Sequence, residues 1–432
     1  MALQWLKEKN LQNLNITLPD GKNASHILSL VKNNNDGTLT VFIVNNDREK
    51  SYQTTISIPS IGKLIALNPL DGSQEEVAVL TASQGTMTFD CFCEPAESHL
   101  FIVDTTRKPQ KRTPRKKLVE HLAVLPSQCA ISLDRENTLT LDMCSYSLDG
   151  SPFSDVMEVW QMQYQVREKL GMRQIHRNGI EQRYAWVDAP HPQDGHTLAF
   201  TLDFTVLHVP EGPVYLVGET PQEFSISLNG QRIAAGPAGY FLDKSFQKVL
   251  LPSLQEGRNT LHITCAYKNR MELENWYIAG AFGVDAERNI IPLPRELQLG
   301  SWTEQGLFHY CGSVDHHYEF ALEEIPRGEI LLDIPQVEAV CTTLTVNGHD
   351  CEIPWQAEHL QVITPYVVRG NNSVTIRVHS SPRNMLGPFH LKGEKPLVTN
   401  DACFTPAAEN WDAGYQVVPY GLMKNPVISV RT

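Results

Sequence analysis

Alternation of apolar and polar residues over short runs is the feature that most restricts the fold of this chain. In the clearest run, TLAFTLDFTVLHV (197–209), apolar side chains occupy every second position over most of its length. Successive side chains of a strand point to opposite faces, so this period predicts a strand with one buried face. Similar runs, rich in β-branched and aromatic residues and bounded by turn residues, occupy 38–46, 51–58, 213–219, 329–335 and 373–380.

One segment has a helical period instead. In DVMEVWQMQYQVREKLG (155–171), apolar side chains fall on one half of a helical wheel and a glycine supplies a stop. These side chains are Val156, Val159, Trp160, Tyr164, Val166 and Leu170. Helices do not separate the predicted strands at crossover spacing, which favours antiparallel pairing. We therefore predict an all-β chain of tandem antiparallel β-sandwiches with one amphipathic helix near 155–171.

A short sequence device occurs twice. Residues 224–232 read FSISLNGQR and residues 342–350 read TTLTVNGHD, and the phrases LQEGRNTLHI and VVRGNNSVTI follow them. Asn-Gly between alternating strands favours a type I′ hairpin, because both central residues need positive φ. The second phrase is a turn that leads into a strand returning to the same sheet. The repeat predicts two jelly-roll sandwiches of one topology, with function in the loops that follow the return strands.

Composition indicates where the units meet. Residues 105–118 hold seven Lys or Arg, two prolines and no acid, which is typical of a solvated linker. Two prolines also follow an apolar run near 289–302. The predicted units are a small β-sandwich at 1–105, a basic linker at 106–127, a jelly roll at 128–295 and a second jelly roll at 296–432.

Charge and hydropathy exclude two classes of partner. The net charge is −13, whereas a nucleic-acid binder needs a basic footprint. No run approaches the roughly 18 apolar residues of a membrane span. Lys7, Glu8 and Lys9 interrupt the amino-terminal segment before an apolar run forms. We therefore expect no signal peptide and a cytoplasmic protein.

The nine cysteines are scattered rather than arranged as a disulfide framework, which favours a reducing compartment. Cys91 and Cys93 in the run CFC lie on one face of a predicted strand, which is how a metal site could begin. No second cysteine pair follows at ligand spacing, so packing at the edge of the core is the favoured interpretation. We expect no cofactor and no metal ligand, although a structural calcium ion is compatible with the sequence.

The repeated phrases resemble the galactose-binding-like jelly roll, the sugar-binding domain of family 2 glycoside hydrolases. Residues 63–104 resemble the small β-domain that follows the barrel of large bacterial α-L-rhamnosidase-like hydrolases, and 136–150, 272–284 and 300–320 resemble that group's C-terminal region. Family 106 rhamnosidases and related β-galactosidase-like proteins are the families concerned. The resemblance covers nearly the whole chain. It implies the accessory region of such an enzyme, without the barrel that carries the catalytic carboxylates.

Glycoside hydrolysis normally needs two facing carboxylates. Glu272 and Glu274 in MELENWY and Glu304 in SWTEQGLF are the candidate acids. Each is interpreted as a loop acid that binds backbone, a structural cation or solvent. We therefore expect no catalytic residue in this chain.

Sugar binding needs aromatic faces together with planar amide, carboxylate or guanidinium groups. The loops beyond the return strands and the tail supply such groups. The predicted contact residues are Trp276, Tyr277, Arg383, Asn384, His390 and Trp411. Two structural interpretations stay open: Asn269 and Asn384 recur at one point of the repeat, as turn caps would, and the tail 409–426 is either a binding loop or a strap against a neighbouring unit.

Three functions remain. The first is a non-catalytic, carbohydrate-binding accessory region or subunit of a glycoside hydrolase acting on complex glycans, partnered by a separate barrel polypeptide or by further copies of itself. The second is a free-standing carbohydrate-binding protein. The third is a hydrolase with its carboxylates on the sandwich loops. An exposed apolar face on the first unit would favour the first function.

Overall fold

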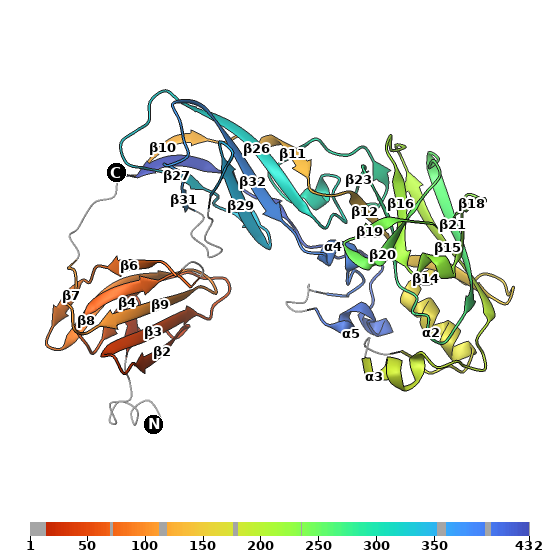
Figure 1. Cartoon of the computed structure of the whole chain (residues 1–432), viewed down its shortest axis with the longest axis horizontal. Helices are drawn as coiled ribbons and strands as arrows, with labels where there is room; N and C mark the ends of the chain where they lie inside the picture. The colour runs from red at the N-terminus through yellow and green to blue at the C-terminus, as the bar shows by residue number, and fades with distance from the viewer. Residues whose placement is uncertain are drawn as a thin grey trace.

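The computed structural model describes residues 14–69, 72–111, 119–175, 180–234, 236–351, 360–393 and 399–431. Its strands form three β-sandwiches in which nearly all neighbouring strands are antiparallel (Figure 1). The prediction of an all-β chain of antiparallel sandwiches is confirmed. In the part of the chain that the structure describes, no helix is long and apolar enough to cross a lipid bilayer.

The first sandwich packs two antiparallel sheets around one core. One sheet has the order β1 (Asn15–Thr17), β4 (Tyr52–Ile58), β8 (Thr86–Cys93) and β7 (Thr81–Ser83). The other has the order β2 (Ile27–Asn33), β3 (Thr38–Asn45), β9 (Ser98–Asp104), β5 (Lys63–Leu67) and β6 (Gln74–Val77). Alternate apolar residues such as Val41 and Ile56 are fully buried between the sheets, which is what the period of two predicts.

The second sandwich contains the largest core. One sheet has the order β12 (Asn137–Leu141), β22 (Trp276–Gly280), β16 (Val214–Glu219), β20 (Asp243–Leu250) and β19 (Pro237–Phe241). The facing sheet has the order β14 (Met157–Glu158), β13 (Met143–Leu148), β15 (His196–Val206), β21 (Gly257–Tyr267), β17 (Ser225–Leu228) and β18 (Gln231–Ile233), and β23 (Gly283–Val284) and β24 (Ile290–Ile291) join it at β15. Short helical segments α3 (Ile180–Gln182), η1 (Arg183–Val187) and η2 (Pro221–Glu223) lie in its loops.

The third sandwich is built from segments that precede and follow the second sandwich in the sequence. Its larger sheet has the order β25 (Glu296–Gln298), β11 (Gln128–Leu133), β26 (Ser313–Leu322), β32 (Gly370–His379), β29 (Cys341–Val346) and β30 (His349–Cys351). Its smaller sheet has the order β10 (Val119–Val124), β34 (Val427–Arg431), β27 (Glu329–Asp333) and β31 (Leu360–Val362). A two-stranded pair β28 (Val337–Glu338) and β33 (Gly421–Leu422) and the short helices η3 (Trp302–Glu304), α4 (Arg383–Leu386), α5 (Asp401–Phe404) and η4 (Ala408–Asn410) complete this region.

The membership of β10 and β11 corrects the predicted unit boundaries. The sequence placed residues 119–124 in a linker and residues 128–133 at the start of the second sandwich. In the structure β10 pairs with β34 and β11 pairs with β25 and β26. The second sandwich is therefore inserted between β11 and β25 of the third. Part of the predicted linker, residues 112–118, lies outside the described residues.

The repeated device occupies equivalent elements in the last two sandwiches. The strand order β15-β21-β17-β18 of one sheet matches β26-β32-β29-β30 of the other. Each hairpin turns at Asn-Gly with positive φ at both residues, 52° and 81° at Asn229-Gly230 and 50° and 78° at Asn347-Gly348. These angles are those of a type I′ turn. The prediction that the two hairpins have the same structural role is confirmed.

A buried asparagine on each return strand completes the device. Asn229 donates to Asn259 Oδ1 at 2.9 Å, and Asn347 donates to Asn372 Oδ1 at 2.8 Å. Asn259 Oδ1 also accepts from Gln255 N at 3.0 Å, and its amide donates to the Gln255 carbonyl at 2.7 Å. Both buried asparagines are at most 1% exposed. Each one therefore satisfies the backbone of the preceding turn and fixes the hairpin to it.

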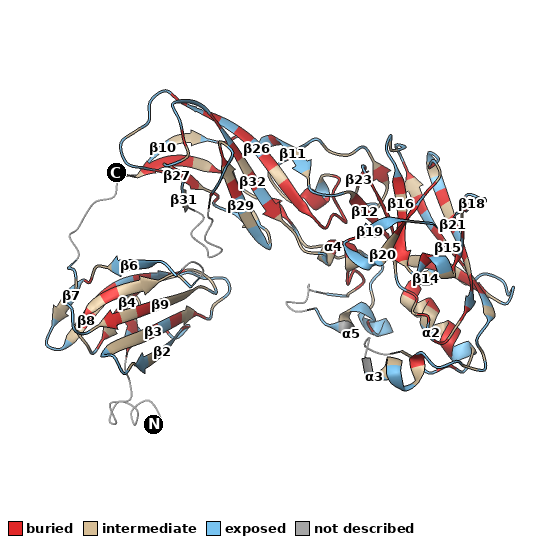
Figure 2. Ribbon diagram, viewed as in Figure 1, coloured by how far each residue is buried: buried red, intermediate tan, exposed pale blue. Residues whose placement is uncertain are grey.

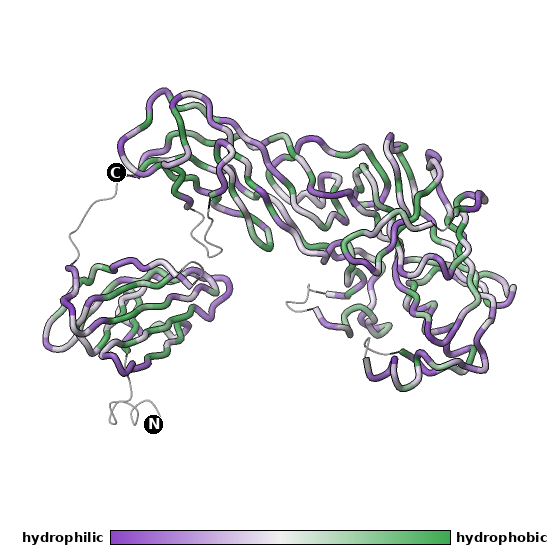
Figure 3. Tube along the Cα trace, in the orientation of Figure 1, coloured by the Kyte–Doolittle hydropathy of each residue, from purple (hydrophilic) through white to green (hydrophobic). Residues whose placement is uncertain are grey.

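The amphipathic helix is shorter than predicted, and the face that it buries differs from the predicted apolar face. Helix α2 spans Val159–Lys169, because Met157 and Glu158 pair with β13 as strand β14. Glu158 and Gln161 form a capping box that starts the helix. The predicted core residues Val156 and Tyr164 are exposed, whereas Arg167 is fully buried. Figure 2 shows the buried residues along the strands of all three sandwiches, and Figure 3 shows hydrophobic and hydrophilic residues alternating along them.

Candidate functional site

Loops at one end of the second sandwich enclose a pocket of about 180 Å³. Strand β16 ends at Glu219, and Thr220 then turns the backbone with φ 46°. A β-branched residue in the left-handed region is uncommon, and such backbone strain concentrates at functional sites. The loop after return strand β21 forms another wall. The pocket is lined by Arg183, Asp188, Glu219, Thr220, Glu223, Phe224, Arg270, Met271 and Glu272.

Ion pairs fix the charged groups of this pocket. Arg183 Nη2 lies 2.8 Å from Glu272 Oε1, and Arg270 Nη2 lies 2.7 Å from Glu223 Oε1. Lys268 Nζ contacts the other oxygen of Glu223 at 3.0 Å, and this contact is the largest cause that lowers the pKa of Glu223. The pocket thus presents paired carboxyl and guanidinium groups in fixed orientations. Such planar groups bind the paired hydroxyls of sugars well.

Two further carboxyl groups near the pocket are harder to ionise. Burial, followed by the negative charge of Glu272, raises the pKa of Glu219. Glu274 is an exposed residue of the loop after β21. Desolvation, followed by the charges of Glu219 and Glu272, raises the pKa of Glu274 to about 7. A carboxyl group with a pKa near neutrality can act as a general acid.

The predicted contact residues Trp276 and Tyr277 belong to the core instead. They are 4% and 3% exposed on β22. The Trp276 ring packs edge-on against Phe224, with ring centroids 5.4 Å apart. It also lies so close to Gly218 that a Cβ there would be 2.5 Å from the ring. The two faces of this ring are therefore enclosed by protein and do not form the predicted stacking surface.

Arg383 and Asn384 hold the tail of the chain. Asn384 is fully buried in α4, and its side chain exchanges two hydrogen bonds of 2.8 Å with the backbone N–H and carbonyl of Val418. Arg383 is half-buried and donates to the Gln416 carbonyl at 3.3 Å. Asn269, at the equivalent point of the first copy, likewise donates to the Trp186 carbonyl at 2.9 Å. Both asparagines thus bind backbone, as the structural interpretation predicted.

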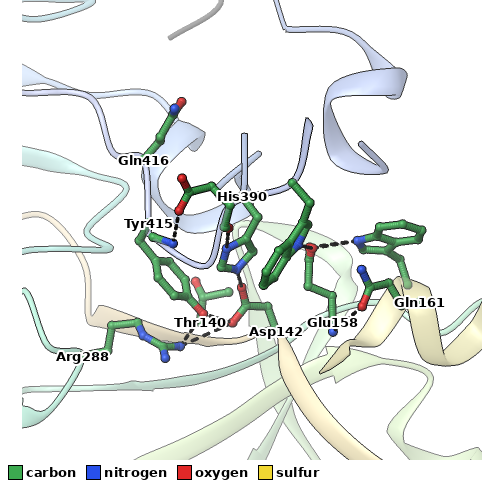
Figure 4. A network of polar contacts seen from close by, with 12 residues as sticks. Thr140, Asp142, Glu158, Gln161, Arg288, His390, Tyr415 and Gln416 are labelled. Carbon is green, nitrogen blue, oxygen red and sulfur yellow. Dashed lines mark hydrogen bonds and ion pairs between the residues drawn. The ribbon is translucent and has the colours of Figure 1, made fainter. Parts of the chain in front are cut away.

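His390 and Trp411 lie in a buried polar network that joins the tail to the second sandwich (Figure 4). Asp142, just beyond β12, accepts a hydrogen bond from Tyr415 and lies 3.4 Å from the guanidinium of Arg288. Trp411 donates to Glu158 Oε2 at 3.0 Å. The network supports the interpretation of the tail as a strap.

Glu304, the third candidate acid, lines a separate and more open pocket of about 440 Å³. Polar side chains from β11, β25 and η3 surround this pocket. They include Gln128, Glu296, Gln298, Ser301 and Gln305. No aromatic residue is among its lining, so the pocket lacks the stacking surface that sugar recognition uses.

Sequence reasoning located the loop of the first pocket but missed most of its residues. Arg270 and Glu272 lie in the loop KNRMELENWYIAG that follows the first return strand, which was predicted to meet sugar. Arg183 and Glu219 come from segments far apart in sequence, so only the folded chain brings them together. Tyr184 follows Arg183 and is 87% exposed. An aromatic residue this exposed has no role in the core, but the sequence gives no signal of its exposure.

No known protein family and no curated protein matches the sequence. Among solved structures, the rhamnosidase from Novosphingobium sp. PP1Y is similar over 99% of this chain and 26% of its own, with a TM-score of 0.47 and 12% identity. The GH31 alpha-xylosidase from Xanthomonas citri is similar over 59% of this chain and 33% of its own, with a TM-score of 0.14 and 8% identity. Both similar structures are glycoside hydrolases. This chain spans about a quarter of the length of the rhamnosidase.

Proposed function

We propose that this chain is a carbohydrate-binding accessory region of a glycoside hydrolase, and that the pocket beside η1 is its sugar site. The observation that carries the proposal is the set of fixed carboxylates and guanidinium groups on the loops at the end of a sandwich. Arg183 with Glu272 and Arg270 with Glu223 supply donors and acceptors side by side. Tyr184 follows Arg183 in the chain and is exposed outside the pocket lining, and we propose that its ring supplies the apolar face for pyranose C–H groups.

The accessory role has a second support in the first sandwich. Leu28 and Leu30 on β2 and Phe42 on β3 are exposed, and Leu30 lies directly opposite Phe42 in the register. Adjacent exposed apolar side chains of this kind mark surfaces that contact other proteins. A catalytic barrel polypeptide is the partner we propose for this surface.

Binding of glycans by the purified chain tests the sugar site. We expect an array of plant-type and bacterial glycans to identify ligands, and calorimetry to give affinities for them. Arg183→Ala or Glu272→Gln should weaken binding at least about tenfold, the effect of losing about 1.4 kcal/mol. Arg258→Ala is the matched control, because Arg258 forms an exposed ion pair with Asp203 on the same sandwich outside the pocket. Equal loss in the control, or no glycan bound by the wild type, would exclude the site.

A second candidate function is hydrolysis by this chain alone. The observation that favours it is the raised pKa of Glu274, about 7, beside Glu272 paired with Arg183. A carboxylic acid of that pKa can donate a proton at neutral pH. The accessory proposal expects no turnover of aryl rhamnosides or galactosides. Turnover that Glu274→Gln abolishes, with folding unchanged, would select the hydrolase instead.

A further inference from the structure

Three metal-ligating side chains converge at one corner of the first sandwich. Cys91 and Cys93 lie on β8 and His99 lies on β9. One ligand atom from each residue lies within 4.8 Å of the other two. Strands β8 and β9 belong to opposite sheets and are joined by the turn at residues 94–97. The cluster therefore sits where the two sheets meet.

The spacing of the sulfur atoms fits a bound metal. Residues two apart on a strand share a face, so both thiols point the same way. The Sγ atoms of Cys91 and Cys93 are 3.8 Å apart. Two thiolates on a tetrahedral ion, each with a metal–sulfur bond of about 2.3 Å, stand about 3.8 Å apart. The two sulfurs are thus already placed as adjacent corners of a zinc-type tetrahedron.

The surrounding residues hold this geometry in place. Cys93 is fully buried and Cys91 is 7% exposed. The fully buried Asn45 donates to the Cys93 carbonyl at 3.3 Å and to the Glu94 carbonyl at 2.8 Å, which fixes the end of β8 and the start of the turn. The His99 ring stacks on Phe101 with ring centroids 5.9 Å apart. The ligands are therefore supported by packing and hydrogen bonds around them.

A carboxylate lies beside the histidine of the cluster. Glu97 Oε2 lies 3.1 Å from His99 Nε2 and accepts from Glu94 N at 2.7 Å. This carboxylate contacts the His99 ring and helps to orient it, but it lies outside the group of three convergent ligands.

We propose that Cys91, Cys93 and His99 bind one Zn²⁺, with water in the fourth coordination position. The ion would join the two sheets of the first sandwich at this corner. The sequence pattern favoured core packing for Cys91 and Cys93, because it did not identify His99 as a third ligand. His99 follows them after a turn and lies on a strand of the facing sheet. This proposal does not depend on the sugar site.

Cobalt titration of the full chain under reducing conditions tests the zinc site. We expect one Co²⁺ per chain, a sulfur-to-metal charge-transfer band, and displacement of Co²⁺ by one equivalent of Zn²⁺. Zn²⁺ should protect two thiols from a thiol reagent and raise the unfolding temperature. Cys93→Ser and His99→Gln should each lose the band, and near-ultraviolet circular dichroism would show whether each variant keeps its fold.

Cys403→Ser is the control variant, because Cys403 lies far along the chain in α5 and outside the cluster. It should bind Co²⁺ as the wild type does. A band that persists in folded Cys93→Ser, or a wild type that binds no Co²⁺ with both thiols reduced, would overturn the proposal. Spontaneous loss of two hydrogens from the Cys91–Cys93 segment, seen by mass spectrometry in air and prevented in both serine variants, would overturn it in favour of a redox-active thiol pair.

Discussion

His390 Nε2 lies 3.0 Å from Asp142 Oδ2, although 248 residues separate the two in sequence. Both side chains are 3% exposed. The pair attaches the tail of the chain to the second sandwich at the point where β12 ends (Figure 4). A charged pair buried to this extent stabilises the structure only while both partners carry their charges.

The pH dependence of stability should report this pair. Burial lowers the pKa of His390, but the hydrogen bond and charge of Asp142 outweigh it, so the pKa is raised above 6.5. The stabilisation is complete below pH 6.5 and is lost as the pH rises through the raised pKa. Urea unfolding should show a free energy that falls from pH 6 to pH 9 in the wild type and changes less in His390→Gln. The exposed His208→Gln should keep the wild-type slope.

At low pH the dependence has the opposite sign, because Asp142 makes the protein less stable as the pH falls. Burial raises the pKa of Asp142, but its contacts, with His390 first, outweigh burial and lower it below 3.8. Its contribution is present above that value and is lost as the pH falls through the lowered pKa. Asp142→Ala leaves His390 and Arg288 without their acceptor and should cost about 3–5 kcal/mol at pH 6. A cost below about 1 kcal/mol would show that the network contributes little.

Arg167 should be essential to the second sandwich. It is fully buried, and its guanidinium donates to the Asn269 carbonyl at 2.9 Å, to Asn269 Oδ1 at 2.7 Å and to Arg173 O at 2.6 Å. Arg167→Met should lower the free energy of unfolding by about 3 kcal/mol, because buried acceptors lose their donors. Glu168→Gln, at an exposed position of the same helix, should change it by less than about 0.5 kcal/mol. Equal effects would contradict the assigned role.

The two buried asparagines of the repeat should contribute equally to the free energy of unfolding. Asn259→Ala and Asn372→Ala each remove the group that satisfies a turn and a hairpin, at a cost of about 2 kcal/mol. Asn371→Ala is the internal control, because its side chain is exposed on the same strand. Chemical denaturation of the three variants measures the effect. A large difference between Asn259 and Asn372 would show that the two copies differ in energy despite their common geometry.

Glu274 should destabilise the protein when it ionises. Its pKa of about 7 lies above the usual 4.5, so the cost is absent below pH 4.5 and complete above pH 7. Glu274→Gln should therefore raise the unfolding temperature at pH 8 and leave it unchanged at pH 4. Glu272→Gln should not raise it at pH 8, because Glu272 pairs with Arg183. A Glu274→Gln variant that is no more stable at pH 8 would show that solvent reaches the carboxyl group.

Local signals predicted the strands and both hairpins, because alternation and turn chemistry are properties of neighbouring residues. The same signals could not place Trp276 in the core, since its burial depends on Gly218 and Phe224 across the sheet. The buried face of helix α2 was predicted incorrectly, because Arg167 is buried by hydrogen bonds to acceptors outside the helix. The return of β21 beside β17 brings Arg270 next to Glu223 across the pocket. Features set by neighbouring residues could therefore be predicted from the sequence, whereas features set by contacts between distant segments could not.

The pairing of β10 with β34 has a consequence for how the chain is made. Ala123 lies opposite Ile428 in that register, so two neighbouring strands of one sheet are synthesised at opposite ends of the last two sandwiches. The second sandwich has both of its sheets once residue 291 has emerged from the ribosome. The third must keep β10 unpaired until β34 appears, and β11 until β25 and β26 appear, which makes its assembly late and exposes apolar strands to aggregation meanwhile. The emergence of β34, rather than the folding of any earlier segment, is therefore the event that completes the third sandwich.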